Sequence, residues 1–202
     1  MTELTELIRD ERLAFVALLE SLSDDQWDTQ SLCSAWTVEH VAAHLAWAPV
    51  AGPVEMGLAS VRAGFNVNRL IADSAVRWTS RGRTAILQQL RDNAGSGAKP
   101  IGVPPVAALA DAVVHGLDVR IPLGVHRDVD PEAFRLIAGW TLGSSWPMTI
   151  PVGGNTRKRL RGTRLVATDA DWSWGEGTDV REPADNILLR LFGRDPALHR
   201  QG

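Results

Sequence analysis

Apolar side chains recur every three or four residues through much of the chain, and this spacing places them on one face of a helix. The first stretch with this pattern should end near Ser23. Its apolar stripe consists of Leu4, Leu7, Ile8, Phe15, Leu18, Leu19 and Leu22. The spacing predicts an amphipathic helix at the start of the chain, and it limits the fold to one in which such a stripe packs against other elements.

The same pattern continues downstream, with recognisable helix starts. Thr37 is a suitable N-cap for a second helix that runs through Leu45. Pro104 and Pro105 suit the first turn of a later helix. Further helices are expected over residues 54–78, 83–93, 106–119 and 131–140. Residues 1–150 are therefore predicted to form an all-helical domain.

The pattern changes after residue 159. Residues 160–169 and 171–177 resemble short strands about a turn, and residues 183–192 resemble a final amphipathic helix. A stretch rich in proline and glycine, residues 147–155, precedes them. We place a boundary in this stretch, which gives a helical domain over 1–150 and a small α+β domain over 151–202. The expected fold class is mainly α.

Composition excludes several classes of protein. The 202 residues have a mean hydropathy of −0.07, and no apolar run approaches the roughly 20 residues needed to cross a bilayer. No membrane span is therefore expected. The charged first residues do not resemble a secretory signal, which favours a cytoplasmic location. Cys33 is the only cysteine, so any metal must be bound by histidines and carboxylates.

Charge gives little reason to expect a nucleic-acid partner. The formal net charge is −3, and the one basic run, residues 157–164, has no interleaved aromatic residues. We interpret this run as a solvated turn and strand edge.

The segment ALADAVVHGLDV places Asp111, His115 and Asp118 four and three residues apart, on one face of a helix. A carboxylate and an imidazole one turn apart can bind the same metal ion. The same spacing is also typical of an ion pair on a helix surface. The motif alone leaves both interpretations open.

A second candidate ligand is His44, which lies between small and apolar residues in HVAAHLAW. Facing helices of a bundle assemble metal sites, and His44 with Asp111 and His115 would supply three protein ligands and leave a fourth position open. The alternative is a core histidine that donates to a backbone carbonyl. His40, one turn earlier, lies further from the apolar face, so His44 is the better candidate.

These residues belong to longer strings that resemble a known family. SLCSAWTVEHVAAHLAW and the later ADAVVHGLDVRIPLG resemble the metal-binding N-terminal domain of the mycothiol-dependent maleylpyruvate isomerase family, part of the DinB-like superfamily of metalloproteins. LVATDADWSWGEG and LLRLFGRDPAL resemble the reduced C-terminal domain of that family. The resemblance covers nearly the whole chain. It implies a DinB-like up-and-down four-helix bundle with a small C-terminal α+β appendix.

The resemblance also implies a site and a cofactor. The family binds a divalent metal, usually zinc, and the matching positions here are His44, Asp111 and His115. The characterised pattern has Glu where this chain has Asp111, which is one methylene shorter. Mycothiol is implied as a thiol cosubstrate, and a small-molecule electrophile as the substrate.

We therefore expect a metal-dependent and mycothiol-dependent isomerase or S-transferase-like enzyme, similar to maleylpyruvate isomerase. A thiol bound to a cation loses its proton readily and becomes a strong nucleophile at neutral pH. Two alternatives stay open. One is a non-catalytic bundle that binds a metal or a small ligand, and the other is a metal-dependent hydrolase that activates water. The sequence gives no expectation for the oligomeric state.

Two residues near the candidate ligands have open roles. We interpret Cys33 as a packed, inert thiol, because the cofactor brings the thiol chemistry in this family, although a helix N-terminus could also lower its pKa. Asp118 either orients His115 as a supporting carboxylate or is a solvated acid at the end of its helix.

Overall fold

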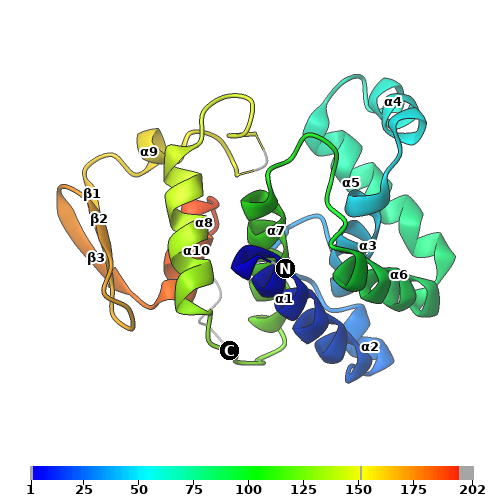
Figure 1. Cartoon of the computed structure of the whole chain (residues 1–202), viewed down its shortest axis with the longest axis horizontal. Helices are drawn as coiled ribbons and strands as arrows, with labels where there is room; N and C mark the ends of the chain where they lie inside the picture. The colour runs from blue at the N-terminus through cyan, green and yellow to red at the C-terminus, as the bar shows by residue number, and fades with distance from the viewer. Residues whose placement is uncertain (1, 151, 196–202) are drawn as a thin grey trace. The chain divides into compact units, whose positions relative to one another are not determined.

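The computed structural model describes residues 2–150 and 152–195 and is mainly helical, with one small sheet (Figure 1). Contacts divide the chain into two compact units, Met1–Val125 and His126–Gly202. The mainly α fold class expected from the sequence is confirmed. Within the described residues, no helix is both long enough and apolar enough to span a membrane.

The first unit contains helices and the connections between them. Its elements are α1 (Glu3–Glu20), α2 (Asp24–Trp27), α3 (Val38–Trp47), η1 (Ala48–Val50), α4 (Pro53–Arg62), α5 (Val67–Trp78), η2 (Thr79–Arg81), α6 (Arg83–Ser96) and α7 (Pro105–Arg120). The predicted caps are in place, with Thr37 at the N-cap of α3 and Pro105 at the first position of α7. Local sequence signals therefore set the starts of these two helices.

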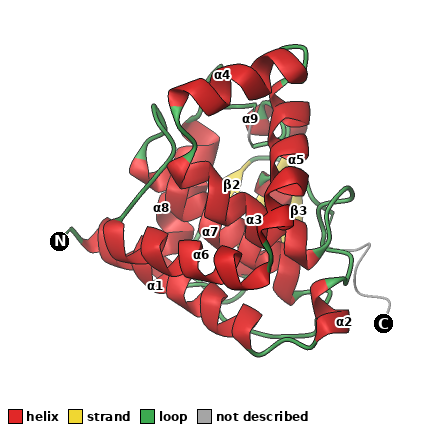
Figure 2. Ribbon diagram, turned by 90° about the vertical axis from the view of Figure 1, so that its right-hand side faces the viewer, coloured by secondary structure: helices red, strands yellow, loops and turns green. Residues whose placement is uncertain are grey.

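Four of these helices pack in a closed ring. The helix α1 packs against α6 and α7, and α3 packs against the same two helices and against α5 (Figure 2). Eight of the ten residues of α3 and eleven of the sixteen residues of α7 are buried. Ala42, Ala43 and Ala46 of α3 have no exposed surface, so neighbouring backbones can approach this helix closely. Polar side chains on α3 and α7 are consequently held inside the unit.

The second unit contains the sheet. Its elements are α8 (Pro131–Gly143), α9 (Thr156–Arg159), β1 (Thr163–Ala167), β2 (Ser173–Gly175), β3 (Thr178–Glu182) and α10 (Ala184–Leu191). The strand order is β2-β1-β3, with β1 antiparallel to β2 and parallel to β3. Leu165 of β1 and Ile187, Leu188 and Leu191 of α10 are fully buried.

The second unit departs from the sequence expectations in three ways. The division after Val125 comes earlier than the boundary expected within 147–155, because α8 packs against α10 and buries Phe134 and Ile137. The strand β3 was not expected, since its burial does not follow a clear apolar alternation. The basic run is exposed at Arg157, Lys158, Arg161 and Arg164, as expected, but it leads into β1, which is the central strand and not an edge.

Candidate metal centre

His44, Asp111 and His115 come together between α3 and α7. The Nε2 atom of His44 lies 3.4 Å from Oδ1 of Asp111, and Nε2 of His115 lies 3.5 Å from the same oxygen. The three potential ligand atoms all lie within 4.8 Å of one another. The two imidazole rings meet edge to face, with centroids 5.0 Å apart. The structure therefore places one carboxylate oxygen and two imidazole nitrogens around one point.

These separations match those of ligands on a tetrahedral zinc ion. Ligands bound at about 2.0–2.1 Å in tetrahedral geometry lie about 3.3–3.4 Å from each other. The two nitrogen-to-oxygen distances of 3.4 and 3.5 Å are close to this value. The donor set of two imidazoles and one carboxylate also suits zinc. The residues present therefore fit the divalent metal that the family resemblance implies.

The contacts of His44 do not include the backbone carbonyl that the alternative expectation requires. The residue is buried, yet its Nδ1 atom has no hydrogen-bond partner within the part of the chain that the structure describes. Its other nitrogen faces Asp111. The alternative expectation, a core histidine that donates to a backbone carbonyl, is therefore wrong. His40 has a separate role, because its Nδ1 atom accepts a hydrogen bond from the backbone N–H of Thr37 at the start of α3.

Asp111 is anionic at neutral pH. Burial by itself would raise the pKa of this carboxyl group, but the charge and hydrogen bond of His44 oppose burial, and the charges of His115 and Arg12 add to their effect. The net result lowers the pKa of Asp111 to about 2. A carboxylate that keeps its charge in a partly buried position is suited to bind a cation.

Asp118 contacts the ring nitrogen of His115 that faces away from Asp111. The Nδ1 atom of His115 lies 2.8 Å from Oδ2 of Asp118, and Asp118 has no exposed surface. The reading of Asp118 as a solvated acid is therefore wrong, and the carboxylate supports His115. Burial would lower the pKa of His115, but the hydrogen bonds to Asp118 and Cys33, with the charges of Cys33 and Asp111, raise it to about 10. Such a carboxylate fixes the orientation of a ligand imidazole.

Replacing Asp118 by asparagine should weaken zinc binding by about 10- to 100-fold, because His115 loses the anion that orients its ring and raises its basicity. A competition titration with a zinc chelator measures the change. Asp128→Asn is the matched control, since Asp128 pairs with the exposed His126 and should not affect the site. Unchanged zinc affinity in the Asp118 variant would exclude this supporting role.

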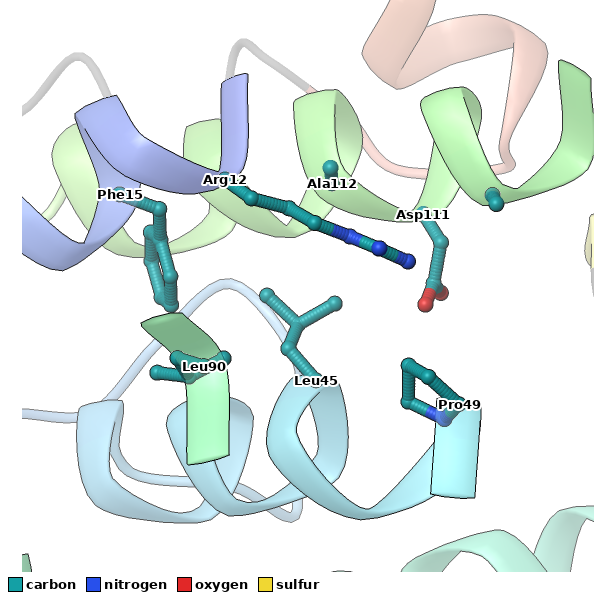
Figure 3. Close-up of a pocket in the computed structure, with 8 residues that line it drawn as sticks. Arg12, Phe15, Leu45, Pro49, Leu90, Asp111 and Ala112 are labelled. Atoms are coloured by element: carbon teal, nitrogen blue, oxygen red, sulfur yellow. The ribbon is translucent and has the colours of Figure 1, made fainter. Parts of the chain in front are cut away.

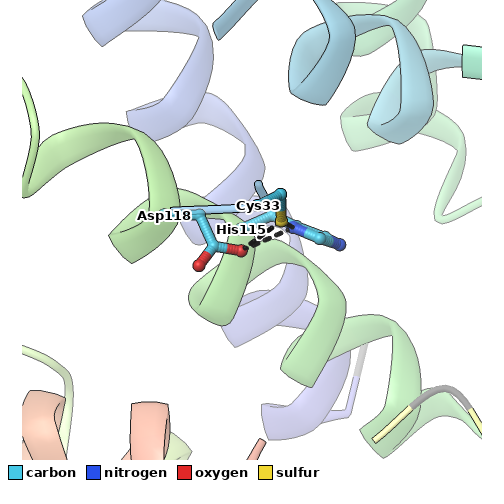
Figure 4. Close-up of side chains that lie close together, drawn as sticks. All are labelled: Cys33, His115 and Asp118. Atoms are coloured by element: carbon cyan, nitrogen blue, oxygen red, sulfur yellow. Dashed lines mark hydrogen bonds and ion pairs between the residues drawn. The ribbon is translucent and has the colours of Figure 1, made fainter. Parts of the chain in front are cut away.

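Cys33 is also part of this cluster (Figure 4). Its Sγ atom lies 3.2 Å from Oδ2 of Asp118 and 3.8 Å from Nδ1 of His115. Cys33, His115 and Asp118 thus form a second group of potential ligands. The 2.8 Å between His115 and Asp118 is, however, a hydrogen-bond distance and is shorter than the separation of about 3.3 Å between ligands of one zinc ion. We therefore assign Cys33 and Asp118 to the support of His115.

Replacing Cys33 by serine should leave the zinc affinity within about threefold of the parent value, since serine keeps a donor towards Asp118 and the ligand set contains no sulfur. The same chelator competition measures it. A much larger loss of affinity would show that the sulfur binds the ion.

Two side chains of the site were not predicted from the sequence. Trp36 is buried and packs against His44 and His115, with ring centroids at 5.0 and 5.7 Å. Arg12 is a buried cation on α1 whose charge acts on Asp111. The sequence held a signal for Arg12, because it falls four residues after Ile8 and three before Phe15, within the apolar stripe of its helix.

Comparison with known proteins places the chain in a family. A family model described as the mycothiol maleylpyruvate isomerase N-terminal domain matches residues 8–120, which is more than half of the chain. The chain belongs to this family. The matched segment of the mycothiol maleylpyruvate isomerase N-terminal domain contains His44, Asp111 and His115. Comparison with curated proteins gives no match.

Solved structures show the same fold as this member of the mycothiol maleylpyruvate isomerase family. The crystal structure of the mycothiol-dependent maleylpyruvate isomerase matches with a TM-score of 0.60 at 14% identity, over 93% of this chain and 86% of that chain. The structure of a histidine-to-alanine mutant of that enzyme matches with a TM-score of 0.51 at the same identity and coverage. At this level of identity the likeness establishes the fold.

Proposed function

We propose that this chain is a metal-dependent enzyme that uses a low-molecular-weight thiol, mycothiol, to isomerise or conjugate a small electrophile. The observation that carries the proposal is the spacing of His44, Asp111 and His115, which suits a zinc ion, in a member of the mycothiol maleylpyruvate isomerase family. We expect the enzyme to act in the cytoplasm, where small thiols stay reduced. The proposed reaction involves neither a nucleic acid nor a membrane.

In this proposal the ion is bound by Nε2 of His44, Oδ1 of Asp111 and Nε2 of His115. A divalent cation there supplies Lewis acidity, which lowers the pKa of a thiol at the open fourth position. The protein contributes the orientation of the ligands. Asp118 fixes the ring of His115, and the alanine-rich α3 lets His44 approach α7 closely. Trp36 packs against both imidazoles.

The chemistry then depends on the electrophile. For isomerisation, the sulfur forms a bond to one carbon of an activated double bond, the remaining single bond rotates, and cleavage of the carbon–sulfur bond restores the double bond and the thiol. For transfer, the sulfur displaces a leaving group and stays on the product. Both reactions need the same activated thiol, so one site supports either.

The test is an activity assay of the zinc-loaded protein with maleylpyruvate, with and without mycothiol. We expect turnover that requires the thiol and that falls by about 100-fold or more in Asp111→Asn, because the thiol is then no longer activated. Asp73→Asn, which removes an exposed acid on α5, is the matched control and should keep full activity. Turnover without thiol would favour a hydrolase. Bound zinc without any turnover, tested on a panel of electrophiles, would favour a non-catalytic binding protein.

A further inference from the structure

Arg12 is a buried cation beside the metal centre with spare hydrogen-bonding capacity. Only 8% of the residue is exposed, and its Nη1 atom donates to the backbone carbonyl of Asn93 at 2.9 Å. Within residues 2–150 and 152–195, no carboxylate lies within 4 Å of its guanidinium group. Arginine is rarely buried without an anionic partner, because an unpaired charge away from water is costly. The remaining N–H groups are therefore available to a ligand.

The guanidinium group points along a recess towards Asp111 (Figure 3). Arg12 and Asp111 are the charged residues that line this recess, and the other lining residues are Phe15, Leu45, Pro49, Leu90, Ala108 and Ala112. The charges of Arg12 and Asp111 interact electrostatically, but the two side chains do not form a direct ion pair. The recess has room for about one water-sized group, so the end group of a ligand could lie there between a cationic fork and the metal ligand Asp111.

Charge balance favours an anion in this position. Burial lowers the pKa of Arg12, but its ordinary value is so high that the group remains charged. A divalent cation held by one carboxylate and two neutral imidazoles keeps a positive charge, and Arg12 adds another. Even when Asp118 is counted, the group as a whole is positive as long as no thiolate is bound to the ion. An anionic ligand in the recess would offset this charge.

We propose that Arg12 binds a carboxylate group of the electrophilic substrate, and that this residue selects carboxylated substrates for the reaction proposed above. The planar fork of arginine matches a carboxylate with two parallel hydrogen bonds, and Nη2 and Nε are not used by the described residues. The apolar walls and the limited room suit a planar carboxylate group better than a strongly hydrated inorganic anion. This inference rests on the proposed function for the reaction, but the binding of the carboxylate can be measured without it.

A structural role of Arg12 is the competing explanation. Its bond to Asn93 connects α1 to α6, and its stem packs within the stripe of α1. A purely structural arginine would affect stability and would leave affinity for an organic acid unchanged. Binding measured on folded protein therefore separates the two explanations.

The test is calorimetric titration of the zinc-loaded protein with succinate, which is unreactive towards thiols, in the absence of any thiol and without turnover. We expect succinate to bind the parent protein at least about tenfold more tightly than the neutral succinamide does. The Arg12→Met variant should lose about tenfold or more in succinate affinity, which is the loss expected when charge-assisted hydrogen bonds are removed. Arg12→Lys keeps the charge but loses the fork, so its affinity should fall by a smaller factor. Arg9→Met, which removes an exposed charge from the same helix, should bind succinate like the parent.

Three results would overturn the inference. Equal succinate affinity in Arg12→Met and the parent, or no preference of the parent for succinate over succinamide, would leave Arg12 with a structural role. Inorganic phosphate that binds as tightly and depends equally on Arg12 would indicate a general anion site and not a carboxylate site. If Arg12→Met does not fold, Arg12→Lys and the comparison of succinate with succinamide still decide. If succinate binding does not depend on Arg12 but thiol-dependent turnover is present, only the role of Arg12 is refuted. If succinate binding depends on Arg12 but thiol-dependent turnover is absent, only the proposed reaction is refuted.

Discussion

Replacing Asp111 by asparagine should lower the zinc affinity of the protein by about 100-fold or more, since even residues that only support a ligand contribute 10- to 100-fold. The Oδ1 atom of Asp111 faces both His44 and His115. Asparagine keeps the shape of the side chain but removes the negative charge, so two neutral imidazoles remain. Chelator competition on the purified variant gives the affinity, and circular dichroism confirms that the helices are retained.

Two further variants calibrate this result. Asp111→Glu has the carboxylate that the family resemblance predicts at this position and should retain zinc binding if the recess accommodates one more methylene. Asp73→Asn removes a carboxylate from the exposed face of α5 and should bind zinc like the parent. If Asp111→Asn binds zinc as tightly as the parent, Asp111 is not a ligand and most of the case for a catalytic metal is lost.

Zinc affinity should also depend steeply on pH. In the metal-free protein the pKa of His115 is raised to about 10, so its imidazole is protonated at neutral pH. Zinc binds only the neutral ring and must displace that proton, so the apparent affinity should rise about tenfold per pH unit between pH 6.5 and 9. Titrations against a chelator of known pH dependence measure the slope. An affinity that does not change with pH would contradict the protonation of His115.

The same raised pKa affects the stability of the metal-free protein. Because the pKa of His115 is about 10 in the folded protein and near 6.5 in an unfolded chain, the charged ring stabilises the fold fully below about pH 6.5. This contribution is lost as the pH rises through 10. Asp118→Asn removes a hydrogen bond that raises the pKa of His115, so the loss of stability should shift to lower pH in this variant.

The helices α1, α3 and α7 of the first unit were predictable because their signals are local. The apolar stripe of α1 and the starts of α3 and α7 at Thr37 and Pro105 are visible in the sequence alone. The relative positions of Asp111 and His115 also follow from helical spacing. That His44 faces them required the resemblance, because no local pattern determines which helices become neighbours.

Other features depend on tertiary contacts that the sequence does not display. Cys33 reaches Asp118 because its loop is fixed to α7 by a backbone hydrogen bond from the N–H of Leu32 to the carbonyl of Asp118. The strand β3 is stabilised by pairing with β1 and not by its own apolar pattern. The helix α8 belongs to the second unit because its apolar face packs on α10, whereas the proline and glycine residues that follow it resembled a domain boundary.

X-ray absorption spectroscopy of the zinc-loaded protein, before and after addition of mycothiol, tests the central claim most directly. Without thiol, the spectrum should show nitrogen and oxygen ligands at about 2.0–2.1 Å and no sulfur, as expected for His44, Asp111 and His115. With thiol, one sulfur ligand at about 2.3 Å should appear. A sulfur ligand before thiol is added would place the ion at Cys33, and a spectrum unchanged by mycothiol would contradict the activation of the thiol by the metal.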